Sequence, residues 1–523
     1  MGEKINPSWG ESFGERPQYV VRSSDNTQDV LVQNEDRFNQ VFSGYDQYDL
    51  LQKFRFVPNK NAEHILNFQY SNSTNIPRYD RLTDPQGSGL RFSEWYYGPQ
   101  QRLLVLYTFK LHNLGEWADN FNLVASFQDI EESRHNRRFN NNSLSNRHEH
   151  VNVFGLTADF QKQIRENKIR YGLDGQFNTL KSTAFSEDIV TGAQSPLDTR
   201  YPDGDNYMNQ VSVYGTHTYE ISNHLVLNDG LRVGGSWLYS SFVDKTFFPF
   251  PYDEVRQNSI TGSANVGLIY LPSSWKFSIM ASTGFRVPNV DDLGKVFESQ
   301  PGTVIVPNPE LGPEKTINGD IGITKFFGSK ARIEGSFYIT DFYDAIVTVP
   351  GTFNGQSVID YEGVPSQVME NANAGRAYLF GFALLGKAEL AKDLTLSASY
   401  NYTHGRVKND TIPNTPLDHI PPTFGRVSLQ YVFNKVNAEI FSNFNGWKRI
   451  SDYGNSGEDN PQYATPDGMP SWYTLNFRLS VDATRFLNVQ IGMDNILDLQ
   501  YRTFASGINA PGRNLFGTVR LKF

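Results

Sequence analysis

The chain ends with the alternating segment Arg513-Asn-Leu-Phe-Gly-Thr-Val-Arg-Leu-Lys-Phe523. One face of this segment carries Leu515, Val519, Leu521 and Phe523, with Gly517 among them, and the other carries Asn514, Thr518, Arg520 and Lys522. A period of two residues is the pattern of a β-strand with one apolar side. A soluble β-sandwich can show the same alternation, but a last strand that stops on an aromatic residue favours a membrane β-barrel.

The composition is compatible with one large β-barrel. The 523 residues contain no Pro-, Ser- or Gly-rich linker, which indicates a single architecture. Only 38% of the residues are hydrophobic, the mean hydropathy is −0.48, and no run of about 18 apolar residues is present, so a helical membrane protein is excluded. In a barrel, lumen-facing and lipid-facing residues alternate and average to such values. The 38 Phe and 27 Tyr suit interfacial girdles, although a Tyr-rich secreted all-β protein would also have them.

Several classes of function are disfavoured by the sequence. The chain has no cysteine, which excludes disulfides, thiolate catalysis and Cys-bound zinc. A net charge of −9 argues against nucleic acid as a partner. No GxSxG, P-loop, HExxH or dinucleotide fingerprint occurs, so we expect neither an enzyme nor a cofactor. The oxygen-rich turns at 203–206 and 452–459 lack EF-hand spacing, so we expect no metal site there.

The joints between strand-like runs alternate between short and long. The short turns lie at 165–168, 222–224, 327–330, 391–393, 434–435 and 483–485, and the long polar loops lie near 75–98, 186–207, 289–313, 350–366, 408–422 and 450–470. Short turns at one rim and long loops at the other are typical of an outer-membrane barrel, and a soluble sandwich has no reason to sort its loops this way. The sequence therefore predicts an all-β, antiparallel transmembrane β-barrel with short periplasmic turns and long extracellular loops.

The strand count predicts that the barrel is not complete in this chain. About nineteen strands can be counted, from 46–57 to 513–523, and the first runs into the short turn at 58–62. A barrel with an even strand count and both ends at the short-turn rim needs an ascending strand before residue 1. We therefore expect residues 1–45 to be the remnant of an extracellular loop, residues 46–523 to be the barrel domain, and the junction between 46–57 and 513–523 to close imperfectly. The opening Met1-Gly-Glu-Lys-Ile-Asn has no apolar stretch, so we expect that the signal peptide is not present in this chain.

Two segments resemble motifs of TonB-dependent outer-membrane receptors. Ser282-Thr-Gly-Phe-Arg-Val-Pro288 resembles the FRAP motif, and Asn308-Pro-Glu-Leu-Gly-Pro-Glu314 resembles NPxLxPE. Further matches follow in the family's order at 337–346, 371–376, 419–422 and 494–502, the last of which resembles NLFDxxYR. The motif positions are Phe285, Arg286, Pro288, Asn308, Pro309, Leu311, Pro313, Glu314, Asn495, Asp498, Tyr501 and Arg502, and Phe523 resembles the terminal aromatic residue read during barrel assembly.

This resemblance implies a 22-stranded barrel that is plugged by an N-terminal globular domain, and nothing here resembles that plug. It also implies an outer-membrane location in a Gram-negative bacterium, contact with lipid, assembly through the last strand, and uptake driven by the TonB complex through the missing plug. Segments 93–99 and 131–134 are most similar to Bacteroidetes members that act as receptors for iron complexes or haem proteins. The implied ligand is therefore an iron complex, such as a ferric siderophore or haem.

Haem importers of the family usually carry a histidine between the two motifs, and segment 289–307 has none, which weighs against haem. A passive outer-membrane porin and a non-transporting, truncated surface binding protein are the alternative functions. We expect ligand contacts in the long loops, because binding residues concentrate in loops on a rigid scaffold.

One candidate ligand-binding set lies in segment 132–150, which we interpret as a hairpin tip. Neutral imidazole binds iron, and arginine pairs with carboxylates of haem or of a siderophore. The alternative is a solvated loop in which Arg147 pairs with Glu149 across the hairpin. The candidates are His135, Arg137, Arg138, Arg147, His148 and His150.

A second candidate set is aromatic and cationic. It comprises Arg78, Tyr79, Trp95 and Tyr96, together with Arg81 and Tyr97. Such residues suit a planar or catecholate ligand, although interfacial or loop packing would use the same residue types. His404 and His419 are predicted at the same rim.

Overall fold

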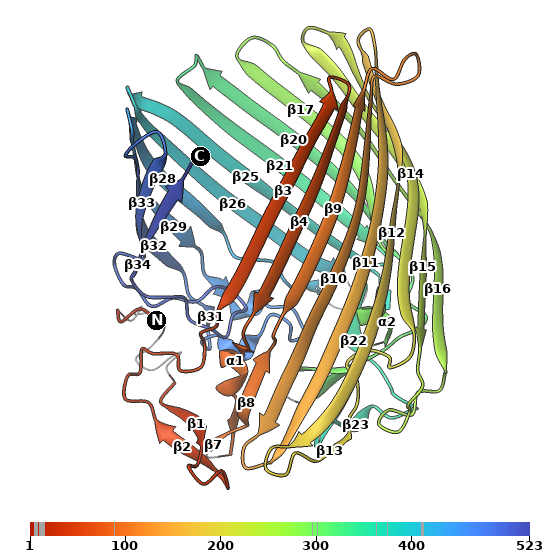
Figure 1. The fold of residues 1–523 in the computed structure, drawn as a ribbon, viewed down its shortest axis with the longest axis vertical. Coiled ribbons are helices and arrows are strands. Elements are labelled where there is room, and N and C mark those ends of the chain that lie inside the picture. The colour runs from red at the N-terminus through yellow and green to blue at the C-terminus, as the bar shows by residue number, and fades with distance from the viewer. Residues whose placement is uncertain are drawn as a thin grey trace.

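The computed structural model describes residues 1–4, 9, 16–87, 89–294, 296–300, 302–361, 363–373, 375–408 and 413–522. Its main element is one antiparallel sheet that wraps into a barrel around a lumen (Figure 1). Phe523, which the sequence analysis singled out, lies outside the described residues. None of the described helices is long and apolar enough to cross a membrane.

Of the 23 strands in this sheet, four are short segments within the long loops, namely β5 (Ile76–Pro77), β8 (Phe92–Tyr97), β13 (Gln194–Pro196) and β27 (Thr415–Pro416). The other nineteen form the wall, which confirms the predicted count for the described residues. They are β3 (Gln47–Asn59), β4 (Ala62–Ser73), β9 (Gln101–His112), β10 (Asn120–Arg138), β11 (Ser143–Ile164), β12 (Asn167–Asp188), β14 (Asn206–Ser222), β15 (Leu225–Ser241), β16 (Glu254–Tyr270), β17 (Trp275–Arg286), β20 (Glu314–Phe327), β21 (Ala331–Tyr343), β25 (Arg376–Ala391), β26 (Leu394–Lys408), β28 (Phe424–Phe433), β29 (Val436–Asn445), β32 (Trp472–Asp482), β33 (Leu487–Asp494) and β34 (Asn514–Leu521).

Loop length sorts by rim as predicted. The short turns lie together at the upper rim in Figure 1, and the long loops lie at the lower rim with the N-terminus. One prediction about the loops is wrong, however. Segment 132–150 is not an extended loop tip, because β10 and β11 stay paired from Asn120 to Asn136, which leaves residues 139–142 as the connection. The side chains of this segment therefore alternate between the two faces of the wall.

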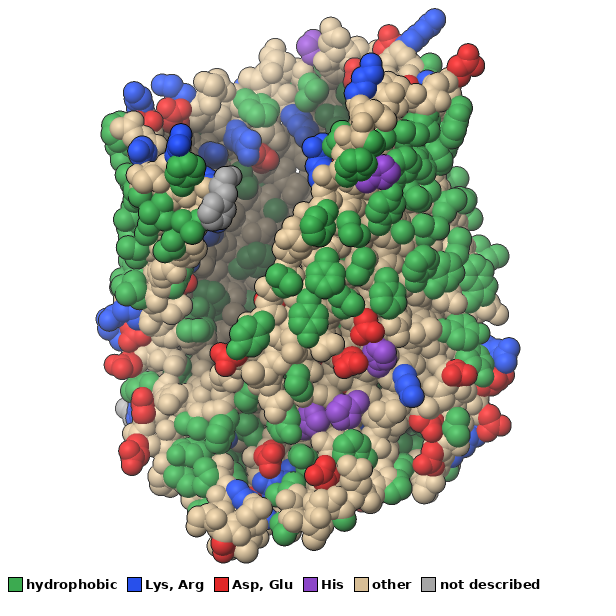
Figure 2. All heavy atoms as spheres, viewed as in Figure 1, with side chains coloured by type: hydrophobic (Ala, Val, Ile, Leu, Met, Phe, Trp, Pro, Cys, Tyr) green, Lys and Arg blue, Asp and Glu red, His purple; other side chains and the backbone are tan. Residues whose placement is uncertain are grey.

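The outer face of the wall is apolar in its middle zone (Figure 2). Phe127, Phe154 and Phe177 are cross-strand neighbours on β10, β11 and β12, and 40%, 46% and 41% of their surfaces are exposed. Such a ladder of exposed rings is unfavourable in water and favourable in lipid. Residues of the same parity as Phe127 on β10 therefore point outward, and those of the other parity point into the lumen.

The wall has two free edges. β3 pairs with β4 and β34 pairs with β33, and no register joins β3 to β34 among the described residues. Every residue of β3 is exposed, and Figure 2 shows a hollow between these two edges. Both strands run toward the short-turn rim in Figure 1, so a direct seam between them would have to be parallel. This gap agrees with the imperfect closure expected from the sequence.

Four smaller sheets lie outside the wall in the described residues, and two of them are the two-residue pairs β6 (Pro85–Gln86) with β7 (Gly89–Leu90) and β30 (Lys448–Arg449) with β31 (Gly468–Met469). The remaining two are larger. One contains β18 (Phe297–Gln300), β19 (Thr303–Val306), β22 (Ile346–Pro350), β23 (Val358–Tyr361) and β24 (Val364–Asn373), and it packs around the buried residues Val304, Val306 and Val368. The other is the hairpin of β1 (Gln18–Arg22) and β2 (Asp29–Gln33). Short helices α1 (Tyr79–Leu82) and α2 (Val290–Gly294) lie in the loops at the same rim.

A buried ion pair fixes the β1–β2 hairpin to the wall. The guanidinium of Arg137 donates to both carboxylate oxygens of Asp29 at 2.8 and 2.9 Å, and the two side chains are 2% and 0% exposed. Ser93 Oγ and the backbone N–H of Asn140 also donate to Asp29, both at 2.7 Å. The N-terminal segment is thereby packed among the long loops.

Candidate functional site

A cavity of about 440 Å³ lies on the lumen side of the long-loop rim. Arg134 of β10 and Arg147 of β11 are cross-strand neighbours, and they point to the face opposite to that of the exposed ladder of Phe127, Phe154 and Phe177. Trp95 and Tyr97 of β8 pair with Asn136 and Arg134 of β10 and so share this inner face. We call this cavity the vestibule. Its lining also includes Arg78, Arg81, Phe92, Asp198, Arg200, Phe297, Glu298, Tyr361, His419 and Glu458.

Arg78 is held against aromatic rings in the vestibule. Its guanidinium carbon lies 4.8 Å from the ring centre of Trp95 and 4.9 Å from that of Tyr97, whose hydroxyl accepts one of its hydrogen bonds. Burial alone would lower the pKa of Arg78, but the hydrogen bond and charge of Asp80, 2.6 Å away, raise it above its ordinary value. The cation is therefore permanent, and its position is fixed by stacking and by one carboxylate.

Among the described residues, five arginines line the vestibule. Each of them lies within 3.9 Å of one carboxylate, and the five partners are Asp80, Asp84, Glu132, Asp198 and Asp291. Arg147 donates to both oxygens of Asp198 at 2.9 Å, so the pairing expected with Glu149 is wrong. The buried Nε of Arg200 has no hydrogen-bond partner among the described residues. Arginine forks next to aromatic faces can receive carboxylate, catecholate or phosphate groups.

The histidines of segment 132–150 do not reach the vestibule, whereas His419, which was predicted at the same rim, is part of its lining. His135 and His148 have the parity of Phe127 and Phe154, so they lie on the outer face of the wall. Tyr96 stacks on His135 with ring centres 4.6 Å apart, and His135 meets His148 edge-on at 5.4 Å. Asn146 and Ser133 bind the two ring nitrogens of His135 at 2.6 and 2.9 Å. These side chains form an outer aromatic cluster in which the rings pack on one another and the ring nitrogens of His135 are hydrogen-bonded within the protein.

Three further candidates do not line the vestibule. Arg137 is the hairpin anchor described above. Tyr79 and Arg138 line a second cavity of about 560 Å³ with Arg91, Tyr463 and Arg502. Tyr79 is buried to 1% exposure beneath the guanidinium of Arg16, and burial raises its pKa to about 12. Of the ten candidates, Arg78, Trp95 and Arg147 thus meet in one place.

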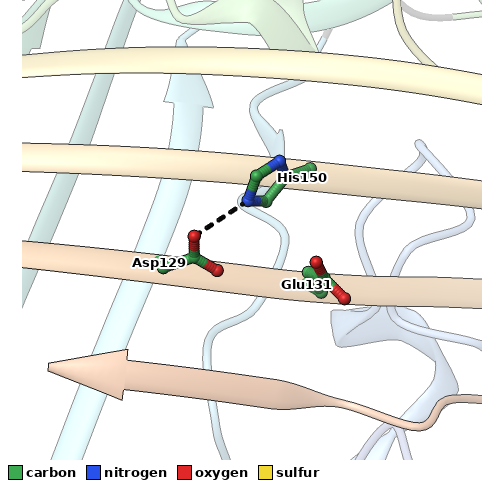
Figure 3. A group of neighbouring side chains, drawn as sticks. All are labelled: Asp129, Glu131 and His150. Atoms are coloured by element: carbon green, nitrogen blue, oxygen red, sulfur yellow. Dashed lines mark hydrogen bonds and ion pairs between the residues drawn. The ribbon is translucent and has the colours of Figure 1, made fainter.

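His150 belongs to a separate outer cluster. Figure 3 shows its imidazole beside Asp129 and Glu131 of β10. Its Nε2 lies 3.1 Å from Oδ2 of Asp129. The three side chains have the outward parity of Phe127 and Phe154, so the wall separates them from the vestibule.

The motif residues connect the long loops to the wall through ion pairs and hydrogen bonds. Arg286 at the end of β17 bridges Asp292 and Glu314, each at 2.9 Å, and Glu314 accepts the backbone N–H of Ile346 at 3.0 Å. Asn308 donates to the carbonyl of Asn371 at 2.8 Å, and Leu311 is buried in a core cluster. Phe285 precedes Arg286 on β17, and Pro288, Pro309 and Pro313 restrict the backbone of the adjoining loop.

The last motif likewise organises the loop before β34. Asn495 is buried and donates to the carbonyl of Leu499 at 2.8 Å. Asp498 accepts the backbone N–H of Arg513 at 2.8 Å, and Tyr501 packs on Trp472 with ring centres 4.4 Å apart. Arg502 donates to the carbonyl of Tyr463 at 2.9 Å. These contacts hold the strand ends at the rim.

The comparisons with known proteins agree with this architecture. The family model "TonB dependent receptor-like, beta-barrel" matches residues 25–496. The chain therefore belongs to the TonB-dependent receptor family, whose members are outer-membrane β-barrel receptors and transporters of Gram-negative bacteria.

Relatives and solved structures are similar over different lengths. The chain is 26% identical over 200 residues to the iron-regulated outer membrane virulence protein of Vibrio cholerae, which is 37% of this chain and 30% of that protein. It is 25% identical over 277 residues to a probable haemoglobin- and haemoglobin–haptoglobin-binding protein of Haemophilus influenzae, 50% of this chain and 26% of that one. Each match thus spans less than a third of the relative. The copper transporter OprC has the same fold, with a TM-score of 0.73, 16% identity, and coverage of 92% of this chain and 72% of its own.

Sequence reasoning missed part of the vestibule. Arg134 lay within the predicted segment, and its parity with Arg147 across a continued β10–β11 pairing would have separated both from the histidines. Arg200 lies in a loop and Phe297 begins β18, both distant in sequence from segment 132–150, and no local pattern marks them.

Proposed function

We propose that the chain forms the wall and vestibule of a receptor that takes up an anionic iron complex, with a ferric siderophore as the preferred class. The observation that carries this proposal is the vestibule, where five arginines surround aromatic rings above the lumen. An anionic chelate offers carboxylate or catecholate oxygens to the guanidinium groups and planar faces to Trp95 and Tyr97. The names of the two relatives, one iron-regulated and one haemoglobin-binding, support iron as the metal that is carried.

Haem is the less favoured cargo. No histidine of segment 132–150 reaches the vestibule, and segment 289–307 contains none. His419 lines the vestibule, but its Nε2 lies 2.8 Å from a Glu458 carboxylate oxygen. An axial iron ligand would have to give up that contact.

Direct binding to the purified, refolded chain tests the proposal. We expect a ferric catecholate siderophore to quench the tryptophan fluorescence of the chain saturably, and the double variant Arg78→Gln/Arg147→Gln to bind at least about tenfold more weakly. Haem and the iron-free chelator serve as comparison ligands. Equal binding by the double variant would contradict the assignment of the vestibule.

We further propose that residues 46–523 are the barrel domain and that residues 1–45 belong to its extracellular loops. In the complete receptor, additional strands would close the wall and a plug domain would fill the lumen. The two unpaired edges and the hollow between them support this proposal. TonB would then act through the plug, and β34 would be the strand recognised by the assembly machinery. Uptake by the complete receptor is expected to stop when an uncoupler removes the proton-motive force, whereas a passive pore would continue to conduct.

The absence of cysteine allows a clean test of the edges. We expect Lys53→Cys and Thr518→Cys, placed on β3 and β34, to form no disulfide on mild oxidation in membranes. Gln490→Cys with Thr518→Cys is the positive control, because these residues are direct partners on β33 and β34. Efficient cross-linking of 53 with 518 would show that the edges meet.

A further inference from the structure

The outer wall carries a set of metal-ligating side chains that the vestibule does not use. The ligand atoms of Asp129, Glu131 and His150 all lie within 4.8 Å of one another. In Figure 3 the three side chains lie on the viewer's side of β10 and β11, while other strands of the barrel lie behind. One imidazole with two carboxylates is a ligand set for divalent transition metals.

The position of this cluster relative to lipid follows from the strand register. Asp129 is two residues beyond Phe127, which corresponds to roughly 7 Å along the strand. Phe127 is part of the exposed ladder with Phe154 and Phe177, so Asp129 and Glu131 stand at the boundary where apolar side chains give way to polar ones. At this level the wall faces lipid headgroups.

The cluster places two carboxylates close together on the outer face of the wall. Asp129 and Glu131 are two residues apart on the same face of β10, and headgroup phosphates beside them would add further negative charge. A bound divalent ion removes the repulsion and links the carboxylates to a phosphate.

A groove beside the cluster provides room for a headgroup. It has a volume of about 680 Å³, and its lining includes His148, His150, Lys181 and Thr183 together with the carboxyl side chains of Glu131, Glu132 and Glu149. Lys181 is the direct cross-strand neighbour of His150 on β12 and brings a positive charge to the groove. The ligand set and the groove are separate features, and they adjoin at Glu131 and His150.

We propose that Asp129, Glu131 and His150 form a divalent metal site on the outer wall, with Zn²⁺ as the best-matched ion, and that a lipid phosphate in the groove fills its open positions. Zinc takes nitrogen and oxygen ligands at about 2.0–2.2 Å, so each side chain has to move by only about 1 Å to bind it. Three protein ligands leave at least one tetrahedral position open toward the groove. The site ties the wall to its annular lipid and is independent of the transported ligand.

Zinc binding to the refolded full chain, without a histidine tag, tests the metal site by titration calorimetry. We expect one equivalent to bind, and His150→Gln and Glu131→Gln each to weaken binding by about tenfold or more. His217→Gln is the matched control, because His217 is a histidine 3.1 Å from Asp229 with no third ligand in the described residues. Unchanged far-UV circular dichroism and heat-modifiable gel migration establish that the variants are folded.

Two results would overturn the metal site. One is the absence of saturable zinc binding to the wild-type chain, and the other is an equal loss of affinity in the His217 control. The lipid part has its own comparison, in which zinc affinity is measured with bisphosphorylated lipid A, dephosphorylated lipid A and inorganic phosphate. We expect the phosphorylated lipid alone to raise zinc affinity several-fold. Equal effects of the two lipids, or of inorganic phosphate at the same phosphate concentration, would remove lipid phosphate as the fourth ligand.

Discussion

The two faces of the β10–β11 ladder near the long-loop rim have opposite chemistry. On the inner face, Arg134 and Arg147 lie beside aromatic rings and open into the vestibule. On the outer face, His135 and His148 pack with Tyr96, and His150 joins two carboxylates. Neighbouring residues in the sequence thus belong to surfaces that the thickness of the wall separates.

This difference shows why proximity in sequence is a poor guide to a site on a β-sheet. In segment 132–150 the histidines and arginines look like one binding set. Since successive strand residues point to opposite faces, the continued pairing of β10 and β11 divides them by parity. The inner set can meet a ligand that approaches the lumen, and the outer set can meet lipid or other loops.

The largest effect is expected from breaking the buried anchor on the outer face. Arg137→Ala removes the bidentate partner of the buried Asp29 carboxylate and leaves it Arg22 at 3.2 Å, which should destabilise the attachment of the hairpin β1–β2 by up to about 3–5 kcal/mol. Limited proteolysis and hydrogen exchange over residues 18–33 report the loss. Arg55→Ala removes an exposed pair with Glu63 and should cost less than about 1 kcal/mol. Similar protection of the hairpin in both variants would mean that Arg137 is not its anchor.

The next effect separates the two faces directly. Arg147→Ala should weaken binding of an anionic chelate by about tenfold, because it removes a charged hydrogen-bond donor from the vestibule. His148→Ala, one residue away on the outer face, should leave binding unchanged within about twofold. Fluorescence titration of both variants measures this. If His148→Ala weakened binding as strongly as Arg147→Ala, the division by parity would fail as a guide to function.

A pH dependence of the hairpin should be smaller. Burial alone would raise the pKa of Asp29, but hydrogen bonds from Arg137, Ser93 and Asn140 lower it to about 2 from an ordinary 3.8. Its contribution to stability is therefore present above about pH 4 and is lost as pH falls toward 2. Hydrogen exchange between pH 5 and 2.5, corrected for intrinsic rates, should show progressive loss of protection in residues 18–33. Asp29→Asn should abolish that trend, and its persistence in the variant would assign it to other carboxylates.

The smallest expected effect concerns His419 in the vestibule. The hydrogen bond from His419 to Glu458 raises the pKa of the imidazole above 6.5, despite partial burial. The protonated form adds positive charge below that pKa, and the charge is lost as pH rises through it. Anionic ligand should then bind about two- to threefold more tightly at pH 6 than at pH 8.5. In His419→Gln this ratio should fall to one, and an unchanged ratio would exclude His419 as its source.

The regular part of the fold followed from local sequence patterns. Alternation of apolar and polar residues located nineteen wall strands, and the sorting of turns by length gave the direction of each one. The motif around Arg286 and Glu314 identified the family. The vestibule was predicted only in part, through Arg78, Trp95 and Arg147 together with Arg81, Tyr97 and His419. Most of its remaining residues come from segments between the wall strands that no periodic pattern describes. The position of β1–β2 depends on the contacts of Asp29 with Arg137, Ser93 and Asn140, which are distant from it in the sequence.

The sequence by itself determined the strand periodicity, the two kinds of rim and the membership of the family, since each depends on residue type at short spacing. Only the tertiary structure decided which side chains meet. In any strand, alternate residues point to opposite faces. Which face lines the lumen depends on how the whole sheet curls and on where its apolar side lies. For that reason Arg147 and His148 are neighbours in the chain but lie on opposite sides of the wall.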